Sequence, residues 1–319
     1  MIAAWLLLLI PLSHQGPAWS LPHSVPVQQV STAKTLTGDE LLRIGEIHDH
    51  QYHFPETLTY YQLALSTFRE HQQARGVATA LVKIAQVYER QGKTQDAYVA
   101  LQEALPLFAR SSDRTAHARA LFVMGRVSAR LGHLDNARAS FSQAITLFER
   151  ANDRHGWNET LVQLGLLQVG DGVTEPGLSL LQQAWKDART RQDRGQQLAA
   201  VVALGNACWL LDRAKDARLY YDKGLRLAEV EQNMTIEAML RLRLAQLDGE
   251  EGRLAEAIEL AKRSLFLSQT LRDTATAAAS LSLLADLYRK MGRSAEAEES
   301  EQRALSIYRS RQILVHGAR

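Results

Sequence analysis

The feature that most constrains this chain is an internal repeat of 40 residues. Seven units align from about residue 38 onward without one inserted residue, on the anchor positions Leu41, Leu81, Leu121, Leu161, Val201, Arg241 and Leu281. A fixed period between about 20 and 50 residues is typical of a stack of repeated units, in which each unit packs only on its neighbours. The chain is therefore expected to form a solenoid and not a domain around one core.

Small residues recur at three fixed places in every unit. Four places after the anchors stand only Gly or Ala, at 45, 85, 125, 165, 205, 245 and 285, and sixteen places after them Ala predominates. Twenty-three places after the anchors stand Ala64, Ala104, Ala144, Ala184, Gly224, Ser264 and Ala304. Small side chains at these places let two helix backbones approach closely. Each unit is therefore predicted to be a pair of packed helices.

Turn signals separate the two predicted helices of each unit and the units themselves. Gly92, Gly132, Gly172, Gly252 and Gly292 recur between the helices, with Tyr52 and Asp212 in the other two units. Glycine just after a helical pattern favours a left-handed helix end. Asp113, Asp153, Asp193, Asn233 and Asp273 precede the next unit and are suited to cap its first helix. Pro106, inside a second helix, predicts a kink or an early end near Leu105.

The run from Leu81 to Gly92, followed by Ala97, Leu101 and Ala104, resembles the tetratricopeptide repeat, and the run from Leu281 to Ala304 repeats the same pattern. The resemblance covers residues 38–310. It implies an all-α fold, a right-handed superhelical solenoid of antiparallel helix pairs. The unit is six residues longer than the common unit of 34 in that family, and the family's fold does not specify an activity.

The resemblance implies that the first helix of each pair lines a concave groove. The expected groove residues are Leu42, Glu46, Val82, Gln86, Arg90, Phe122, Arg126, Arg130, Val162, Leu166, Val202, Asn206, Trp209, Leu242, Gln246 and Asp286. Chaperone-type members of the family grip a terminal carboxylate with Lys at places that hold Leu42, Val82 and Phe122 here, so that binding mode is not expected. In an alternative interpretation, Phe122, Leu166 and Trp209 pack between the first helices.

The N-terminus predicts export. Residues 2–12 form an uncharged apolar run, and Ala18-Trp19-Ser20 offers small residues before a cleavage point, as in a secretory signal peptide. We expect a signal peptide at 1–20, a linker at 21–37, seven repeats at 38–310 and a tail at 311–319, in a secreted or periplasmic protein. The segment before the run has no Lys or Arg, which leaves a membrane-anchored or a cytoplasmic protein as alternatives. The run is also too short to span a bilayer.

The charge balance and the reactive side chains limit the kinds of partner and reaction that the chain can support. The 37 basic and 35 acidic residues nearly cancel, so the chain lacks the positive excess that nucleic acid attracts. Cys208, the single cysteine, stands at a packing position and is expected to be a buried thiol. His50 and His53, with His48, form the one cluster with metal-ligand chemistry, and ordinary packing is the competing interpretation. No catalytic residues and no cofactor are predicted.

The function expected from these observations is a scaffold or adaptor that binds a peptide or protein segment in the groove. One alternative is a self-assembling structural module of the cell envelope, in which the seventh unit docks on the first unit of another copy. A weaker alternative is a metal-binding protein that uses the histidine cluster between His48 and His53. The partner's identity does not follow from the sequence.

Overall fold

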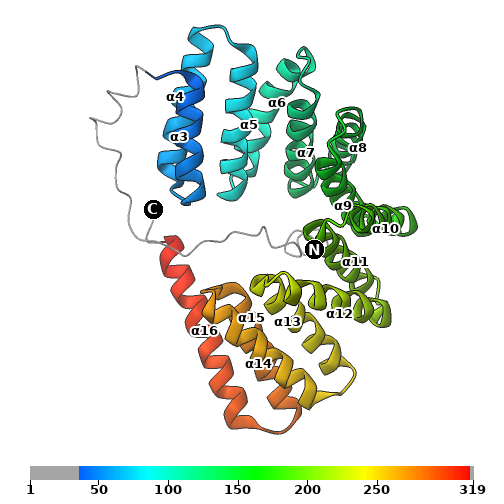
Figure 1. Ribbon diagram of the computed structural model, residues 1–319. Helices are drawn as coiled ribbons and strands as arrows, with labels where there is room; N and C mark the ends of the chain where they lie inside the picture. The colour runs from blue at the N-terminus through cyan, green and yellow to red at the C-terminus, as the bar shows by residue number, and fades with distance from the viewer. Residues whose placement is uncertain (1–35, 317–319) are drawn as a thin grey trace. The chain divides into compact units, whose positions relative to one another are not determined.

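A computed structural model describes residues 36–316, with side chains as far as residue 309, and within them there are fourteen α-helices and no strand (Figure 1). The predicted signal peptide and nearly all of the predicted linker lie outside the described residues. In chain order the helices are α3 (Gly38–His50), α4 (Phe54–Glu70), α5 (Ala74–Arg90), α6 (Thr94–Ala109), α7 (Arg114–Arg130), α8 (Leu134–Arg150), α9 (Arg154–Gly170), α10 (Thr174–Thr190), α11 (Arg194–Leu210), α12 (Ala214–Val230), α13 (Met234–Glu250), α14 (Leu254–Thr270), α15 (Thr274–Lys290) and α16 (Ser294–His316). None of the described helices has the length and apolar character needed to cross a membrane.

The chain divides into two compact units, of which the first contains α3 to α9 and most of α10, up to Asp187. The second begins at Ala188 and contains α11 to α16. Inside each unit, helices that follow one another in the chain lie side by side and antiparallel (Figure 1). Contacts are more extensive within a helix pair, such as α7 with α8, than between successive pairs. The helix pair is therefore the structural element that repeats.

Turns of one geometry join the helices. Gly132, after α7, has a φ of 78°, and Gly92, Gly172, Gly252 and Gly292 adopt the same left-handed conformation. His133 donates its backbone N–H to the carbonyl of Ser128 at 2.9 Å, which satisfies one of the carbonyls left open at the helix end. Tyr52 and Asp212 hold the same conformation without being glycine, at φ values of 59° and 57°. The predicted glycine turns are confirmed.

The acidic and amide residues before the first helices act as N-caps, as predicted. The side chain of Asp113 accepts a hydrogen bond from the backbone N–H of Ala116 at 2.9 Å, and Asp153 does the same with Gly156. Asp193, Asn233 and Asp273 cap α11, α13 and α15 in the same way. Each cap satisfies a backbone donor that the helix itself leaves open. Pairs of helices therefore restart at the same place in each unit.

Close packing inside a pair depends on a size match between two positions sixteen residues apart. Where the small residue on the first helix is glycine, the facing residue is large: a Cβ on Gly125 would lie 2.5 Å from the ring of Phe141, and one on Gly205 would lie 2.6 Å from Tyr221. Gly45 faces Tyr61 in the same manner, whereas Gly165 faces Leu181 and lies close to the backbone of Gly177, whose carbonyl oxygen would be 2.9 Å from an added Cβ. Ala85, in contrast, stands sixteen places before Leu101. The larger ring occupies the volume that the missing methyl group leaves.

The early helix end predicted near Leu105 is wrong, and the alternative, a kink, stays a prediction. Helix α6 continues through Pro106 to Ala109, one residue short of the usual end. Proline removes one backbone donor, which leaves the carbonyl of Gln102 without its helical partner. Both Gln102 and Pro106 lie on the exposed side of the helix, where water can satisfy that carbonyl. The helix is therefore able to tolerate the missing bond.

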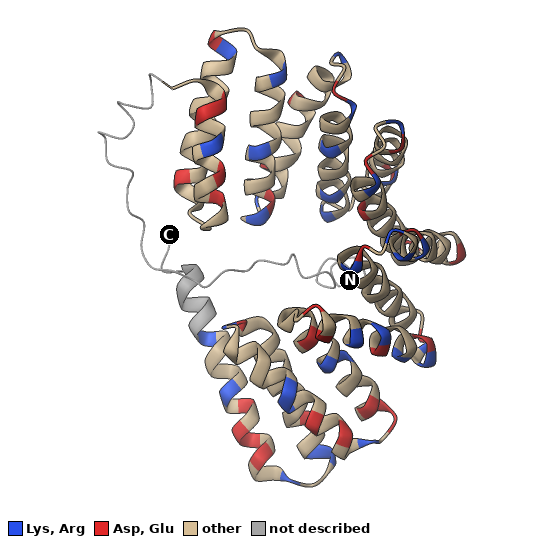
Figure 2. Ribbon diagram, viewed as in Figure 1, with Lys and Arg blue, Asp and Glu red and all other residues tan. Residues whose placement is uncertain are grey.

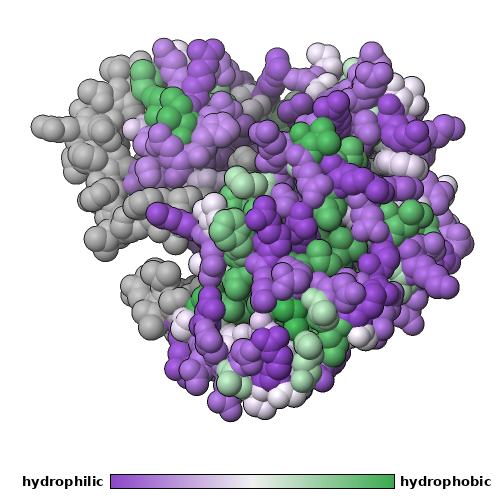
Figure 3. Space-filling model, turned by 60° about the horizontal axis from the view of Figure 1, so that its bottom comes forward, coloured by the Kyte–Doolittle hydropathy of each residue, from purple (hydrophilic) through white to green (hydrophobic). Residues whose placement is uncertain are grey.

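Charged residues of both signs cover the outer surface of the helices in each unit, and acidic residues gather on the first half of α16 (Figure 2). On the face shown in Figure 3, apolar side chains reach the surface as separate patches among hydrophilic ones. Broad apolar surfaces on soluble proteins mark contacts with partners, whereas isolated apolar residues are normal. A binding site must therefore be sought in the local arrangement of side chains.

Candidate functional site

The first helices of the first unit are joined by a ladder of ion pairs. Glu89, near the end of α5, has a fully buried carboxylate that accepts a hydrogen bond from Nη2 of Arg126 on α7. Arg130, one turn further along α7, places its Nε 3.6 Å from the same carboxylate and donates from Nη1 to the backbone carbonyl of Glu89 at 3.2 Å. Two arginines of one repeat thus enclose one acid of the repeat before it.

The same ladder continues to the start of the first unit. Arg90 on α5 pairs with Asp49 on α3, and the Nζ of Lys83 lies 2.8 Å from a carboxylate oxygen of Glu46. Arg90 also lies over the ring of Phe54, 5.6 Å from its centroid. Three expected groove cations, Arg90, Arg126 and Arg130, are therefore already neutralised by carboxylates of their own chain.

The apolar row expected one place after each anchor is mostly enclosed between helices. Its members Leu42, Val82, Phe122, Val162, Val202 and Leu242 are 5–9% exposed. The ring of Phe122, for example, lies 6.0 Å from that of Phe141 on the second helix. Leu166 and Asn206, expected on the neighbouring row, are buried as well. A role of these residues in contact with a partner remains a prediction, and their side chains offer little surface for it.

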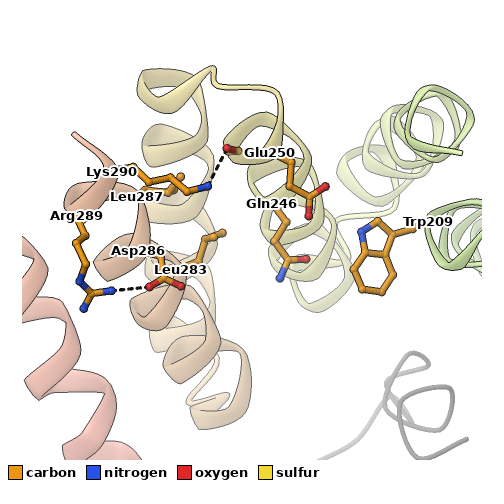
Figure 4. Close-up of a pocket in the computed structure, with 9 residues that line it drawn as sticks. Trp209, Gln246, Glu250, Leu283, Asp286, Leu287, Arg289 and Lys290 are labelled. Atoms are coloured by element: carbon orange, nitrogen blue, oxygen red, sulfur yellow. Dashed lines mark hydrogen bonds and ion pairs between the residues drawn. The ribbon is translucent and has the colours of Figure 1, made fainter. Parts of the chain in front are cut away.

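A pocket of about 570 Å³ lies along the first helices of the second unit (Figure 4). Its lining comes from α11, α13 and α15: Trp209, Gln246, Gly249, Glu250, Leu283, Asp286, Leu287, Arg289 and Lys290. Three of the expected groove residues, Trp209, Gln246 and Asp286, are thus brought together from three repeats. Glu250 and Arg289 stand nine and eight places after their anchors, at places that the family resemblance also puts in the groove, whereas Leu283 was not expected.

The charges in the pocket are largely satisfied within the chain. Lys290 donates from Nζ to the backbone carbonyl of Gly249 at 3.2 Å, and Arg289 donates to Asp286 at 2.8 Å (Figure 4). Arg289 also binds Glu301 on α16 at 2.9 Å. Glu250 is exposed. Trp209 and Leu283, both half-buried, provide apolar surface between these groups.

Arg243 on α13 is a functional candidate that was not predicted from the sequence. Its guanidinium lies over the ring of Trp209, 5.2 Å from the centroid, and donates to the side-chain oxygen of Gln246 at 3.0 Å. Burial lowers the pKa of Arg243, and among the described residues no carboxylate is paired with it. Arg243 is half-buried, and a cation that loses hydration without gaining an acid is costly. A signal was present in the sequence, because a charged residue interrupts the apolar pattern of α13 at this place.

Behind the pocket, α11 and α12 are fixed by buried polar contacts. The hydroxyl of Tyr221 donates to the side-chain oxygen of Asn206 at 2.9 Å. Cys208 is buried on α11, as expected, and burial raises the pKa of its thiol to about 11. A thiol with such a pKa is not ionised at neutral pH and is a poor nucleophile. These residues therefore support Trp209 and do not themselves form a reactive site.

The histidine cluster at the end of α3 packs against aromatic rings. The ring of His48 stacks on Tyr60 at a centroid distance of 5.3 Å, and it lies 6.0 Å from the ring of His53. Among the described residues, no three His, Cys, Asp or Glu side chains are grouped so that they could hold a metal ion. His50 is exposed. The geometry thus gives His50 and His53 no third ligand.

Consecutive antiparallel helix pairs define a helical-repeat protein of the solenoid class. The family model of the tetratricopeptide repeat matches residues 76–150 and 235–310, one segment in each compact unit. The fold and the two matched segments are those of a tetratricopeptide-type repeat protein. No curated protein matched the chain in sequence.

Solved structures share the fold at low sequence identity. The apo form of the quorum sensor NprR from B. thuringiensis superposes with a TM-score of 0.69 at 14% identity, over 88% of this chain and 80% of that one. The Rap conjugation gene regulator of the plasmid pLS20, in complex with the Phr* peptide, has a TM-score of 0.61 at 16% identity, over 95% and 81%. Aspartyl phosphate phosphatase F from Bacillus subtilis has a TM-score of 0.65 at 13% identity, over 88% and 72%.

Proposed function

We propose that this protein is a non-enzymatic interaction scaffold that binds a peptide segment of a partner in the pocket of its second unit. The observation that carries the proposal is the pair formed by Trp209 and Arg243. An apolar ring faces the pocket, and beside it a desolvated guanidinium has a ring and an amide as partners but no carboxylate. Both groups have binding capacity that the chain itself does not use.

The pocket's chemistry suggests the kind of segment that would fit. Trp209 and Leu283, which line the pocket, would hold an apolar side chain. Arg243 lies over the ring of Trp209 and is not itself a lining residue; it would pair with a carboxylate that reaches past that ring, which arginine can bind through two parallel hydrogen bonds. Glu250 and Lys290, at the ends of two first helices, would favour a partner with both charge signs. We therefore propose an extended or helical segment in which an acidic residue stands next to an apolar one.

The similar structures support binding rather than chemistry. One of them was solved with the Phr* peptide, and another is described as a quorum sensor. A third is described as a phosphatase, so the fold alone does not exclude catalysis. The side chains of the site favour a non-enzymatic role, because the thiol of Cys208 has a raised pKa and acids such as Glu89 and Asp286 are paired with arginines.

The proposal is tested by selection from a library of displayed peptides against the purified chain. We expect enrichment of sequences that combine an acidic with an apolar residue, and we expect Trp209→Ala to abolish that enrichment. Phe266 on α14 offers a matched control, because it is an exposed aromatic residue with Arg263 over its ring at 5.3 Å, outside the pocket. If Phe266→Ala abolishes binding and Trp209→Ala does not, the site is misplaced.

Two further variants test the role of the guanidinium. Arg243→Gln should weaken binding of a selected peptide at least tenfold, and Arg243→Lys should recover only part of the loss because lysine lacks the planar fork. Replacing the acidic residue of the peptide by its amide should have the same effect as Arg243→Gln, with no further loss when both changes are combined. Additive losses would show that Arg243 does not contact that acid.

We also propose that the protein is exported. The support is the apolar run followed by Ala18-Trp19-Ser20 in the sequence. Mass spectrometry of the protein purified from its native host should find a mature chain that begins at Leu21. An intact N-terminus would argue for one of the alternatives, a membrane-anchored or a cytoplasmic protein.

A further inference from the structure

The first described helix exposes a residue that five of the six comparable helices bury, the sixth, Leu167 on α9, being half-buried. Ile47 on α3 is 57% exposed, whereas Val87, Val127, Ala207, Leu247 and Leu287, at the same place in other repeats, are at most 1% exposed. The covering comes from the preceding repeat: a Cβ on Gly249 of α13 would lie 2.7 Å from Leu287 of α15. Helix α3 has no preceding repeat among the described residues. Ile47 therefore marks a stacking face without a partner.

The last helix exposes the complementary face. Tyr308 on α16 is 44% exposed, whereas Phe68, Phe108, Phe148, Ala188, Ala228 and Ser268, at the same place, are at most 3% exposed. The ring of Phe148 shows what normally covers this place, because it lies 2.4 Å from a Cβ built on Gly156, in the first turn of the next repeat. Leu305, also on α16, is 45% exposed, whereas Leu265 at the same place is buried and the equivalent residues of the other five repeats are half-buried. The final repeat thus presents the apolar side chains that a following repeat would cover.

The charges on these two faces are opposite at the positions that form ion pairs between repeats inside the chain. Inside the chain, Lys83, two places after its anchor, pairs with Glu46, five places after the anchor of the preceding repeat. At the same places, the first and last repeats carry Arg43 and Asp286. Opposite charges would therefore meet if α3 of one copy followed α15 of another.

A second ladder pair gives the same result with the signs reversed. Arg126, five places after its anchor, pairs with Glu89, eight places after the preceding anchor. The first repeat carries Glu46 at the former place, and the last repeat carries Arg289 at the latter. The third recurring pair, of the kind Arg90 makes with Asp49, has no counterpart, since it would set His50 beside Arg289. Two of the three ladder pairs could thus form at the junction, where Asp286 and Arg289 would exchange the exposed contact that they make with each other, and Glu46 its contact with Lys83, for partners in the other copy.

We propose that copies of this chain associate head to tail, with α3 of one copy stacked on α15 and α16 of the next as an eighth repeat. Ile47, Leu305 and Tyr308 become buried in the junction, and Arg43 and Glu46 of one copy alternate with Asp286 and Arg289 of the other. The interface is heterologous, so each copy uses two different surfaces. The proposal does not depend on peptide binding in the pocket.

The test measures the mass of the full chain by sedimentation velocity over a wide range of concentration. The mass of the unaltered chain should rise with concentration. Arg43→Asp and Asp286→Arg should each remain monomeric, because like charges then meet at every junction. An equimolar mixture of these two variants should associate again, since each junction between unlike copies joins opposite charges. The variant that carries both changes should also associate.

Control variants test whether association depends on these two faces. Arg114→Asp and Glu256→Arg reverse exposed charges away from both faces and should associate as the unaltered chain does. Tyr308→Asp should remain monomeric in every mixture, because it removes the apolar contact. A chain that is monomeric at all concentrations overturns the proposal. So does association that persists in Arg43→Asp, or a mixture of the charge variants that stays monomeric while each retains its helical circular dichroism.

Discussion

Arg126 on α7 donates a hydrogen bond to the carboxylate of Glu89 on α5, a fully buried group 37 residues earlier in the chain. A buried acid is stable only when cations compensate the loss of its hydration, and here Arg126 and Arg130 both contribute. The pair therefore holds two consecutive repeats in a defined register.

Removal of the acid should destabilise the first unit. Glu89→Ala leaves two half-buried arginines without a carboxylate, and we expect a loss of about 3 kcal/mol in the free energy of unfolding. Urea unfolding measures this loss. The control is a chain with Glu89→Met, Arg126→Met and Arg130→Met together, which should lose less than Glu89→Ala alone. A larger loss in the triple variant would mean that side-chain volume, and not charge, holds the repeats.

The size match between Gly125 and Phe141 gives a second prediction. Gly125→Ala should lower the melting temperature, because the new methyl group would lie within 2.5 Å of the ring, and overpacking of this kind costs about 1–3 kcal/mol. The combination with Phe141→Leu reproduces the pair Ala85 and Leu101 and should recover most of the loss. If the double variant is no more stable than Gly125→Ala, the two positions are not coupled.

The repeat, the small positions, the glycine turns and the caps could all be predicted, because each depends on residues close in sequence and recurs with the period. The direction of each side chain around its helix could not. Phe122 and Leu166 stand on first helices, as expected, but neighbouring helices enclose them. Periodicity places a residue on a helix but does not determine which neighbour its side chain faces. It therefore cannot tell a residue that lines a groove from one that packs between helices.

Interactions between repeats could not be predicted from the sequence either. Glu89 and Arg126 are 37 residues apart, and their contact depends on how successive first helices lie against each other. Arg243 was not predicted for a similar reason, since its partner ring, Trp209, belongs to the preceding repeat. Trp209, Gln246 and Asp286 were found because the family resemblance supplied the groove positions. The pocket that they share required the structure.

A third prediction concerns the turns. Asp212 has a left-handed backbone conformation at the place where other repeats carry glycine, and a residue with a Cβ is strained there. Asp212→Gly should therefore raise the stability of the second unit by about 1 kcal/mol. Gly132→Ala should lower that of the first unit by a similar amount, through strain alone, because no atom lies within 4 Å of the new methyl group. Thermal unfolding measures both, and changes of the opposite sign would show that backbone strain does not govern these turns.

The thiol of Cys208 predicts a loss of stability at alkaline pH. Its pKa is about 11 in the fold, against about 8.5 in an unfolded chain, so the folded state favours the neutral thiol. Below about pH 8 both states are neutral and the group contributes no pH dependence. As the pH rises through about 8.5 toward 11, the unfolded chain ionises first, and we expect a loss of about 1–2 kcal/mol by about pH 10.

Comparison with Cys208→Ala isolates this effect from other titrating groups, including Tyr221, whose pKa is also raised by burial. The cost of Cys208→Ala in urea unfolding should be smaller at about pH 10 than at about pH 8. An equal cost at both values would show that the thiol ionises as easily in the fold as in the unfolded chain.

The identical spacing of the turns makes whole repeats interchangeable in backbone but not in order. Deletion of residues 114–153 would join Asp113 to Arg154 and recreate a capped helix start, and every remaining turn would keep its length. Glu89 would then stand next to Leu166 and Gly170 in place of its two arginines. A gene that lost or reordered such a repeat would encode a chain with intact helices, but an acid would lack its partner where the new neighbours meet. The ion pairs between repeats therefore favour one order of the repeats.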